Sequence, residues 1–163
     1  MRTCLAVLAV AVAALSHPPA QAAGQVEVQF VNPQSFTDAA DLWVGNADNL
    51  ATIAGHLQRL GQKYLQDGQV LRIEVLDIDL AGRARPTRWL HRTRVTSNPL
   101  DWPRLHLRFA LESGGRLLRS GEQSIADLAF QSHLSHDGWQ ELGFEKRLLT
   151  DWFRSTFGPQ AAP

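Results

Sequence analysis

The feature that most constrains the fold is a pair of strand-like segments separated by two glycines. Every second residue from Leu105 to Leu111 is apolar, and the residues between are polar or small. This period of two is typical of a strand with one buried face. Gly114 and Gly115 follow, and glycines readily adopt the positive φ angles of a tight turn. Because Leu117–Ile125 then returns, the pattern predicts a β-hairpin.

Upstream of this hairpin, the sequence has a strand, helix and strand pattern. Val26–Phe30 alternates apolar and polar residues, and Val70–Leu80 is rich in Val, Ile and Leu. Between them a helix, capped by Asn46 or Asp48, is predicted from apolar residues at spacings of three and four. Its apolar stripe consists of Leu50, Ile53, Ala54, Leu57, Leu60 and Tyr64. This order of elements favours parallel pairing of the two strands.

The remaining segments complete an α+β domain. Residues 82–99 are basic and polar, and within them we expect only Arg92–Thr96 to form a strand. A second helix is predicted over Phe144–Phe157 and ends at Gly158-Pro159. We therefore expect one α+β domain over residues 23–163, with a mixed, mostly antiparallel sheet of four to five strands and two helices packed on one face.

The N-terminal segment has the organisation of a cleavable signal peptide. Arg2 supplies the positive charge, residues 5–15 are apolar, and Ala20-Gln21-Ala22 offers small residues at cleavage spacing. The apolar run is about half of the roughly 20 residues that cross a hydrocarbon core, so we expect no transmembrane anchor. Cys4 precedes this run, whereas a lipid-modified cysteine would follow it. We expect residues 1–22 to be removed and the protein to reside in the periplasm without being a lipoprotein.

Composition excludes several classes of function. Lys plus Arg and Asp plus Glu each number 16, and removal of Arg2 leaves 15 against 16, a net charge of minus one. This balance gives no reason to expect nucleic acid as a partner. Without Cys4 the mature chain has no cysteine, which excludes disulfides, thiolate metal sites and a cysteine nucleophile. Because no hydrolase elbow, phosphate loop or zinc-protease motif is present, the sequence implies no cofactor.

Asp77 and Asp79 are the candidate acid–base or metal-binding pair. Two residues apart on a strand, their carboxylates point to the same side and could bind a divalent cation or exchange a proton. Leu71, Ile73 and Val75 would point to the same side of the strand as the two aspartates. We therefore expect the strand to leave the core at the aspartates. In that alternative, the carboxylates accept hydrogen bonds from turn amides before Leu80–Gly82.

Tryptophans and arginines form a second group of candidates. Trp43, Trp89, Trp102 and Trp139 lie in predicted loops. Indole rings stack on sugars, and we favour Trp102, next to Pro103 and Arg104, as the centre of a binding patch, with Trp89 as a further candidate. The arginines of residues 82–94 could bind phosphate groups, or they could be the solvated residues of a strand edge.

His133 and His136 have a spacing that could hold a metal ion if their loop were helical. Both side chains can ligate zinc or copper as neutral imidazoles. The spacing offers no third or fourth ligand, so a solvated loop is the alternative interpretation.

Several stretches resemble an uncharacterised proteobacterial family of exported proteins, number three thousand and sixteen in the domain-of-unknown-function series. They are Val26–Phe30, Phe36–Asp38, Val70–Ile73, Asp77–Gly82, Trp102–Leu105 and Phe144–Phe153. The resemblance implies export and a single domain, and it implies no activity, cofactor or catalytic residue. One departure concerns Pro86 and Trp89, which the family usually has as an adjacent pair.

Three functional hypotheses follow. The first is a non-catalytic module of the cell envelope that binds a protein or glycan through Arg83–Arg104. The alternative is a small metal-dependent or acid–base hydrolase that uses Asp77 and Asp79. A third is an assembly subunit whose exposed sheet edge pairs with a strand of a partner.

Overall fold

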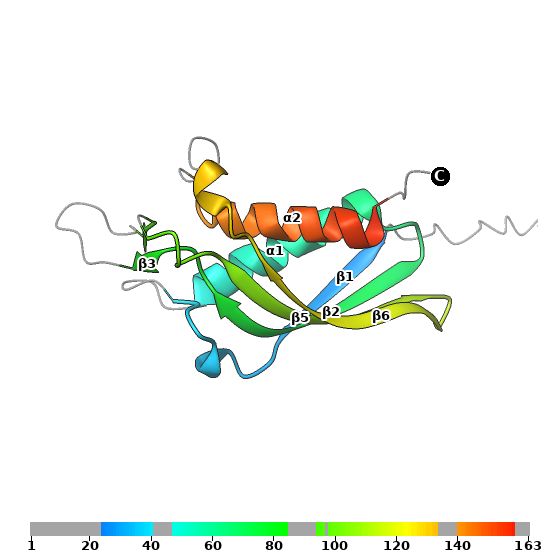
Figure 1. Cartoon of the computed structure of the whole chain (residues 1–163). Helices are drawn as coiled ribbons and strands as arrows, with labels where there is room; N and C mark the ends of the chain where they lie inside the picture. Colours follow the sequence, from blue (N-terminus) through cyan, green and yellow to red (C-terminus); the bar gives the residue numbers. More distant parts are fainter. Residues whose placement is uncertain (1–23, 41–46, 85–93, 97, 134–139, 159–163) are drawn as a thin grey trace, which may run out of the picture.

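The computed structural model describes residues 24–40, 47–84, 94–96, 98–133 and 140–158. Its main sheet has the strand order β1-β2-β5-β6. The strands are β1 (Gln25–Phe30), β2 (Gln69–Asp79), β5 (Arg104–Ser113) and β6 (Arg116–Ala126), with a separate pair β3 (Arg83–Ala84) and β4 (Arg94–Val95). The helices are α1 (Ala47–Tyr64), α2 (Gly143–Phe157) and the short 3-10 turns η1 (Pro33–Ser35) and η2 (Phe130–His133). Both α-helices lie on one side of the main sheet (Figure 1).

The predicted fold class is confirmed. β1 and β2 pair in parallel, as the strand, helix and strand order indicated, and the other pairs are antiparallel. The hairpin of β5 and β6 turns at Gly114 and Gly115, whose φ angles are 56° and 75°. Two positive φ angles in succession are what a two-residue hairpin turn requires, and glycine adopts them without steric cost. Of the predicted strand Arg92–Thr96, the structure describes residues 94–96, which include the two-residue strand β4.

The core lies between the sheet and the two helices. Ile53, Leu57 and Leu60 of the predicted stripe are buried against it, as are Trp152 and Phe153 of α2. Burying a side chain of this size stabilises the fold by roughly 1.5–3 kcal/mol. Among the described residues, no helix is both long and apolar enough to span a membrane.

A β-bulge in β2 changes which residues face the core. Ile73 and Val75 pair with core residues of β5, but the register shifts between Val75 and Asp77. Beyond the shift, Ile78 pairs with the core residue Leu105, while Asp77 and Asp79 pair with polar residues on the opposite face. The prediction that the aspartates lie on the same face of the strand as Ile73 was therefore wrong. The extra residue of a bulge reverses the alternation, so the strand stays in the core.

Candidate functional site

Asp77 is held by main-chain and side-chain donors at the bulged end of β2. Its Oδ1 accepts hydrogen bonds from the amide nitrogens of Thr37 (2.7 Å) and Ile78 (2.9 Å). Its Oδ2 accepts a third from the Thr37 hydroxyl at 2.8 Å. The interpretation that this carboxylate binds backbone amides agrees with these contacts, although one amide belongs to the chain after β1 and not to the expected turn.

Asp79 is buried and paired with Arg104 on the neighbouring strand. Oδ2 of Asp79 accepts hydrogen bonds from Nε of Arg104 at 3.1 Å and from its Nη2. The guanidinium of Arg104 also lies over the ring of Trp102, 5.8 Å from its centroid. Trp102 is half-buried against a small cluster of Ala81, Phe130 and Phe144. The structure thus brings together three predicted site residues, with Arg104 in contact with both Asp79 and Trp102.

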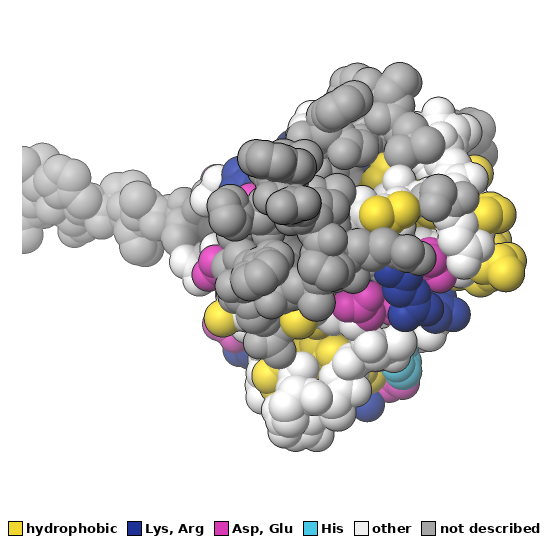
Figure 2. Space-filling view, turned by 90° about the vertical axis from the view of Figure 1, so that its left-hand side faces the viewer, with side chains coloured by type: hydrophobic (Ala, Val, Ile, Leu, Met, Phe, Trp, Pro, Cys, Tyr) yellow, Lys and Arg dark blue, Asp and Glu magenta, His cyan; other side chains and the backbone are white. Residues whose placement is uncertain are grey.

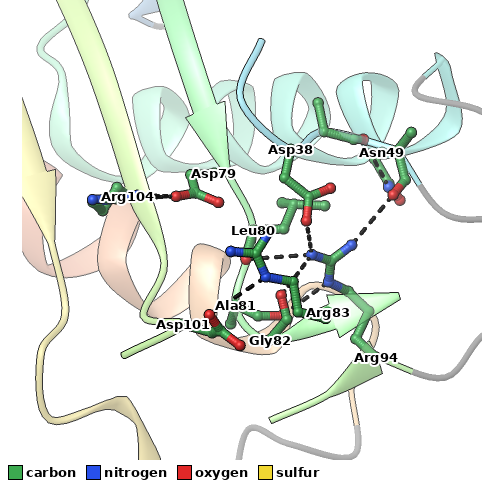
Figure 3. A network of polar contacts seen from close by, with 12 residues as sticks. Asp38, Asn49, Asp79, Leu80, Ala81, Gly82, Arg83, Arg94, Asp101 and Arg104 are labelled. Carbon is green, nitrogen blue, oxygen red and sulfur yellow. Dashed lines mark hydrogen bonds and ion pairs between the residues drawn. The ribbon is translucent and has the colours of Figure 1, made fainter. Parts of the chain in front are cut away.

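Arg94 binds the main chain at the same end of the sheet (Figure 3). Its side chain is 13% exposed and pairs with Asp38, with 2.5 Å between Nη2 and Oδ2. It also donates to the carbonyl oxygens of Ala40 and of all three residues Leu80–Gly82. A guanidinium suits this role because its five N–H donors point outward in a fixed plane. Arg94 therefore ties the chain after β1 to the end of β2.

The structure describes only part of the basic segment. Arg83 is exposed, and its Nε lies 3.4 Å from Oδ1 of Asp101. Trp89 and the arginines between β3 and β4 in the sequence (Arg85, Arg88 and Arg92) lie outside the described residues. In the part of this end that the structure describes, basic side chains lie beside acidic ones (Figure 2). The described arginines therefore do not form the continuous positive patch that would favour phosphate binding.

Two buried polar residues were missed by sequence reasoning. Glu145 is 2% exposed, and its Oε1 accepts a hydrogen bond from the amide of Ala81 at 2.7 Å. Asn49 is equally buried and donates from Nδ2 to the carbonyl of Ala39 at 3.1 Å. Both lie in segments that the sequence predicts to be helical. Their positions next to the apolar stripes were the available signal, because a polar residue within such a stripe needs a buried partner.

The histidine pair is only half described. His133 lies in η2, where its Nδ1 is 3.2 Å from Oδ2 of Asp127, and His136 lies outside the described residues. Within the described ranges, no group of three or more His, Cys, Asp or Glu side chains could hold a metal ion.

The face of the sheet that carries no α-helix in the described chain is polar and charged. Arg72 and Arg108 each bind carboxylates on both neighbouring strands. The acidic partners are Glu27 and Glu112 for Arg72, and Glu74 and Glu122 for Arg108. These hydrogen bonds raise the pKa of both arginines, and the bond from Arg108 is the main reason why the pKa of Glu122 is lowered. The pairs are exposed, so water screens them.

The outer edge of the sheet is formed by the long strand β6. β6 is the last strand in the sheet order, and each of its eleven residues is exposed or partly exposed. Among the described residues, no strand pairs with its outer edge. Leu117 and Leu118 are apolar residues that remain 56% and 42% exposed there. Long exposed edges of this kind pair readily with strands of other chains.

A groove of about 600 Å³, here called the β6–α2 groove, lies between this strand and α2. Arg119 and Gln123 line it from β6, and each is bonded to α2. Nη1 of Arg119 donates to the carbonyl of Thr156, and Oε1 of Gln123 accepts from Nε1 of Trp152 at 2.7 Å. Ile125 and Leu148 provide its apolar lining. The groove therefore combines fixed polar groups with an apolar section beside a free strand edge.

A family model described as "Protein of unknown function (DUF3016)" matches residues 24–155, which is most of the chain. The chain belongs to the DUF3016 family. This confirms the resemblance that stretches such as Asp77–Gly82 and Phe144–Phe153 indicated. No curated protein matches the chain, and no solved structure does.

The DUF3016 match runs from the start of β1 into the last turn of α2. It therefore includes Asp77, Asp79, Arg94 and Arg104, and all of β6. The family description assigns none of these residues a role, so their function is argued from geometry alone.

Proposed function

We propose that this DUF3016 protein is a non-catalytic module of the cell envelope that binds another protein along the outer edge of β6. The single observation that carries the proposal is an exposed edge strand of eleven residues beside the β6–α2 groove. An unpaired edge offers main-chain donors and acceptors in a regular row, and an added strand satisfies them. The signal-like residues 1–22 support export to the periplasm.

The other hypotheses receive less support. A hydrolase that uses Asp77 and Asp79 stays a prediction, but Asp77 accepts three hydrogen bonds and Asp79 is paired with Arg104. A general base must be within reach of a substrate proton, which such engaged carboxylates do not favour. Glycan binding at Trp102 is disfavoured because Arg104 lies over its ring.

Site-specific photo-crosslinking in living cells tests the proposal. A photoreactive residue replaces Ser120 or Ser124 of β6, both of which are exposed. The control places it at Gln29, which is exposed on β1 at the opposite edge of the sheet. We expect one discrete protein adduct from the β6 positions and none from the control. Equal adducts from both strands, or no adduct from β6, would contradict the proposal.

A further inference from the structure

We infer that the partner contributes an extended segment that adds to β6 as an antiparallel fifth strand. In this arrangement an acidic side chain of the segment lies beside Arg119 and an apolar side chain lies beside Ile125. The inference rests on the proposed function, because it requires that β6 be the binding edge, and it adds the chemistry of what is bound.

The main chain of β6 determines the conformation of the ligand. The ladder of β6 on β5 shifts register at Leu118, and the regular part of β6 that follows, Arg119–Ala126, is about 26 Å long and can accommodate a segment of similar length. β6 already pairs in antiparallel fashion with β5 on its inner side. Antiparallel pairing is slightly more stable per residue than parallel pairing, which favours the same orientation for the added strand.

The register of β6 determines which of its residues face the helices. Arg119, Gln123 and Ile125 are paired with core-facing residues of β5, namely Leu111, Leu107 and Leu105. Residues directly opposite each other in a ladder share a face of the sheet. Alternate side chains of an added strand would therefore point toward the groove beside Arg119, Gln123 and Ile125, and the others would point to the charged face.

The lining of the groove determines the chemistry of those side chains. Arg119 is exposed, and the hydrogen bond described for it uses only one of the five donors of a guanidinium. Contact with Thr156 holds this group in the lining of the groove, where a carboxylate is the matching ligand. Ile125 and Leu148 lie at the other end and favour an apolar side chain. Since six positions separate Arg119 from Ile125, the two partner residues are six positions apart.

The β6 strand of a second copy of this chain does not supply the acidic group. In a two-fold antiparallel pairing of β6 centred on Gly121, Gln123 lies opposite Arg119. The acidic residue of β6 is Glu122, and it is already bound to Arg108 and His106 on the charged face. Charge complementarity therefore points to an acidic segment from a different protein.

Selection from a phage-displayed library of random twelve-residue peptides tests the inference on the purified chain. We expect enriched peptides to carry an apolar residue followed six positions later by Asp or Glu, which is the order that antiparallel pairing requires. Arg119→Glu should weaken their binding at least tenfold, and Arg119→Gln should weaken it by a smaller factor. Arg116→Glu makes the same charge change on β6 outside the groove lining, and we expect less than a threefold effect.

Main-chain pairing is tested with the same peptides. N-methylation of those alternate peptide amides that face β6 should abolish binding, because each then loses its main-chain hydrogen bond. N-methylation of the intervening amides should be tolerated. Melting temperature and circular dichroism identify any variant that fails to fold. Failure to enrich any peptide, or equal binding to Arg119→Glu, Arg119→Gln and the unmodified chain, would overturn the inference. Adducts from Ser120 in that case would leave the proposed function intact.

Discussion

The carboxylate of Asp77 binds Thr37 twice, through the amide nitrogen at 2.7 Å and the hydroxyl at 2.8 Å. These bonds join the chain after β1 to the bulged end of β2, forty residues later. Arg94 of β4 joins the same two segments, because it pairs with Asp38 and also donates to the carbonyl oxygens of Leu80–Gly82. The charged residues at this end of the sheet therefore act first as structural ties.

Replacing Asp77 tests whether it has such a structural role. We expect Asp77→Ala to lower the free energy of unfolding by about 2 kcal/mol, because hydrogen bonds to a charged group contribute roughly that much. Asp77→Asn, which keeps an acceptor oxygen, should cost about half as much. Urea unfolding measures both, and a double-mutant cycle with Thr37→Val isolates the shared term. An unchanged midpoint in Asp77→Ala would show that the bonds contribute nothing.

Arg94 provides a sharper test, because it is mostly buried. Arg94→Met removes the partner of Asp38 and leaves four carbonyl groups without this donor. We expect a loss of about 3 kcal/mol, since breaking a buried ion pair leaves an uncompensated charge. The matched control is Arg83→Met, whose side chain is 63% exposed and should change stability by less than about 1 kcal/mol. Similar losses in both variants would contradict the structural role of Arg94.

Most of the fold could be predicted from the spacing of apolar residues, because that spacing is two in a strand with one buried face and three or four in a helix. Alternation over Leu105–Leu111 located β5, and the spacing of Ile53, Leu57 and Leu60 located α1. The bulge in β2 and the register shift at Leu118 in β6 were exceptions. In β2, the adjacent apolar residues Val75 and Leu76, followed by apolar Ile78, were the signal that the alternation reverses.

The site was less predictable, because its contacts are long-range. The pairing of Asp79 with Arg104 follows from the register of β2 on β5, which the sequence alone does not determine. Arg94 looked like any other arginine of a basic segment, and nothing local indicated that Asp38 would lie next to it. The β6–α2 groove could not be predicted, because it depends on where α2 packs against the sheet.

Cleavage after Ala22 is a prediction that the structure does not address. We expect the protein isolated from cells to begin at Ala23, as measured by intact-mass and N-terminal peptide analysis. Ala22→Arg should prevent cleavage, because signal peptidase sites require small residues there, and the precursor should accumulate. A mature protein that retains residues 1–22 would contradict the export prediction.

Close packing of α1 on β1 depends on a glycine. A Cβ atom at Gly61 would lie 2.2 Å from Cγ2 of Val26, so Gly61→Ala should destabilise the fold by about 2 kcal/mol. Adding Val26→Ala should recover part of that loss. Gly55 on the same helix is the control, because its Cβ would meet nothing closer than 3.6 Å. Gly55→Ala should therefore stabilise the fold by about 1 kcal/mol, and a loss there would contradict the packing described.

His56 should make stability depend on pH. Its half-buried Nε2 lies 2.9 Å from both the carbonyl of Lys146 and the hydroxyl of Thr150 on α2. Burial lowers its pKa below 6.5, and the nearby charges of Arg59 and Lys146 lower it further, although the bond to the Lys146 carbonyl opposes this shift.

The sign of the effect follows from proton uptake. As pH falls below 6.5, the unfolded chain binds a proton at His56 before the folded chain does, so stability falls with pH. His56→Gln keeps a donor for the carbonyl and cannot titrate. We expect its melting temperature to decline less between pH 7 and pH 5 than that of the unmodified chain. The control, His106→Gln, removes an imidazole paired with Glu122 and should not reduce the decline. Parallel curves for His56→Gln and the unmodified chain would show that this histidine does not carry the dependence.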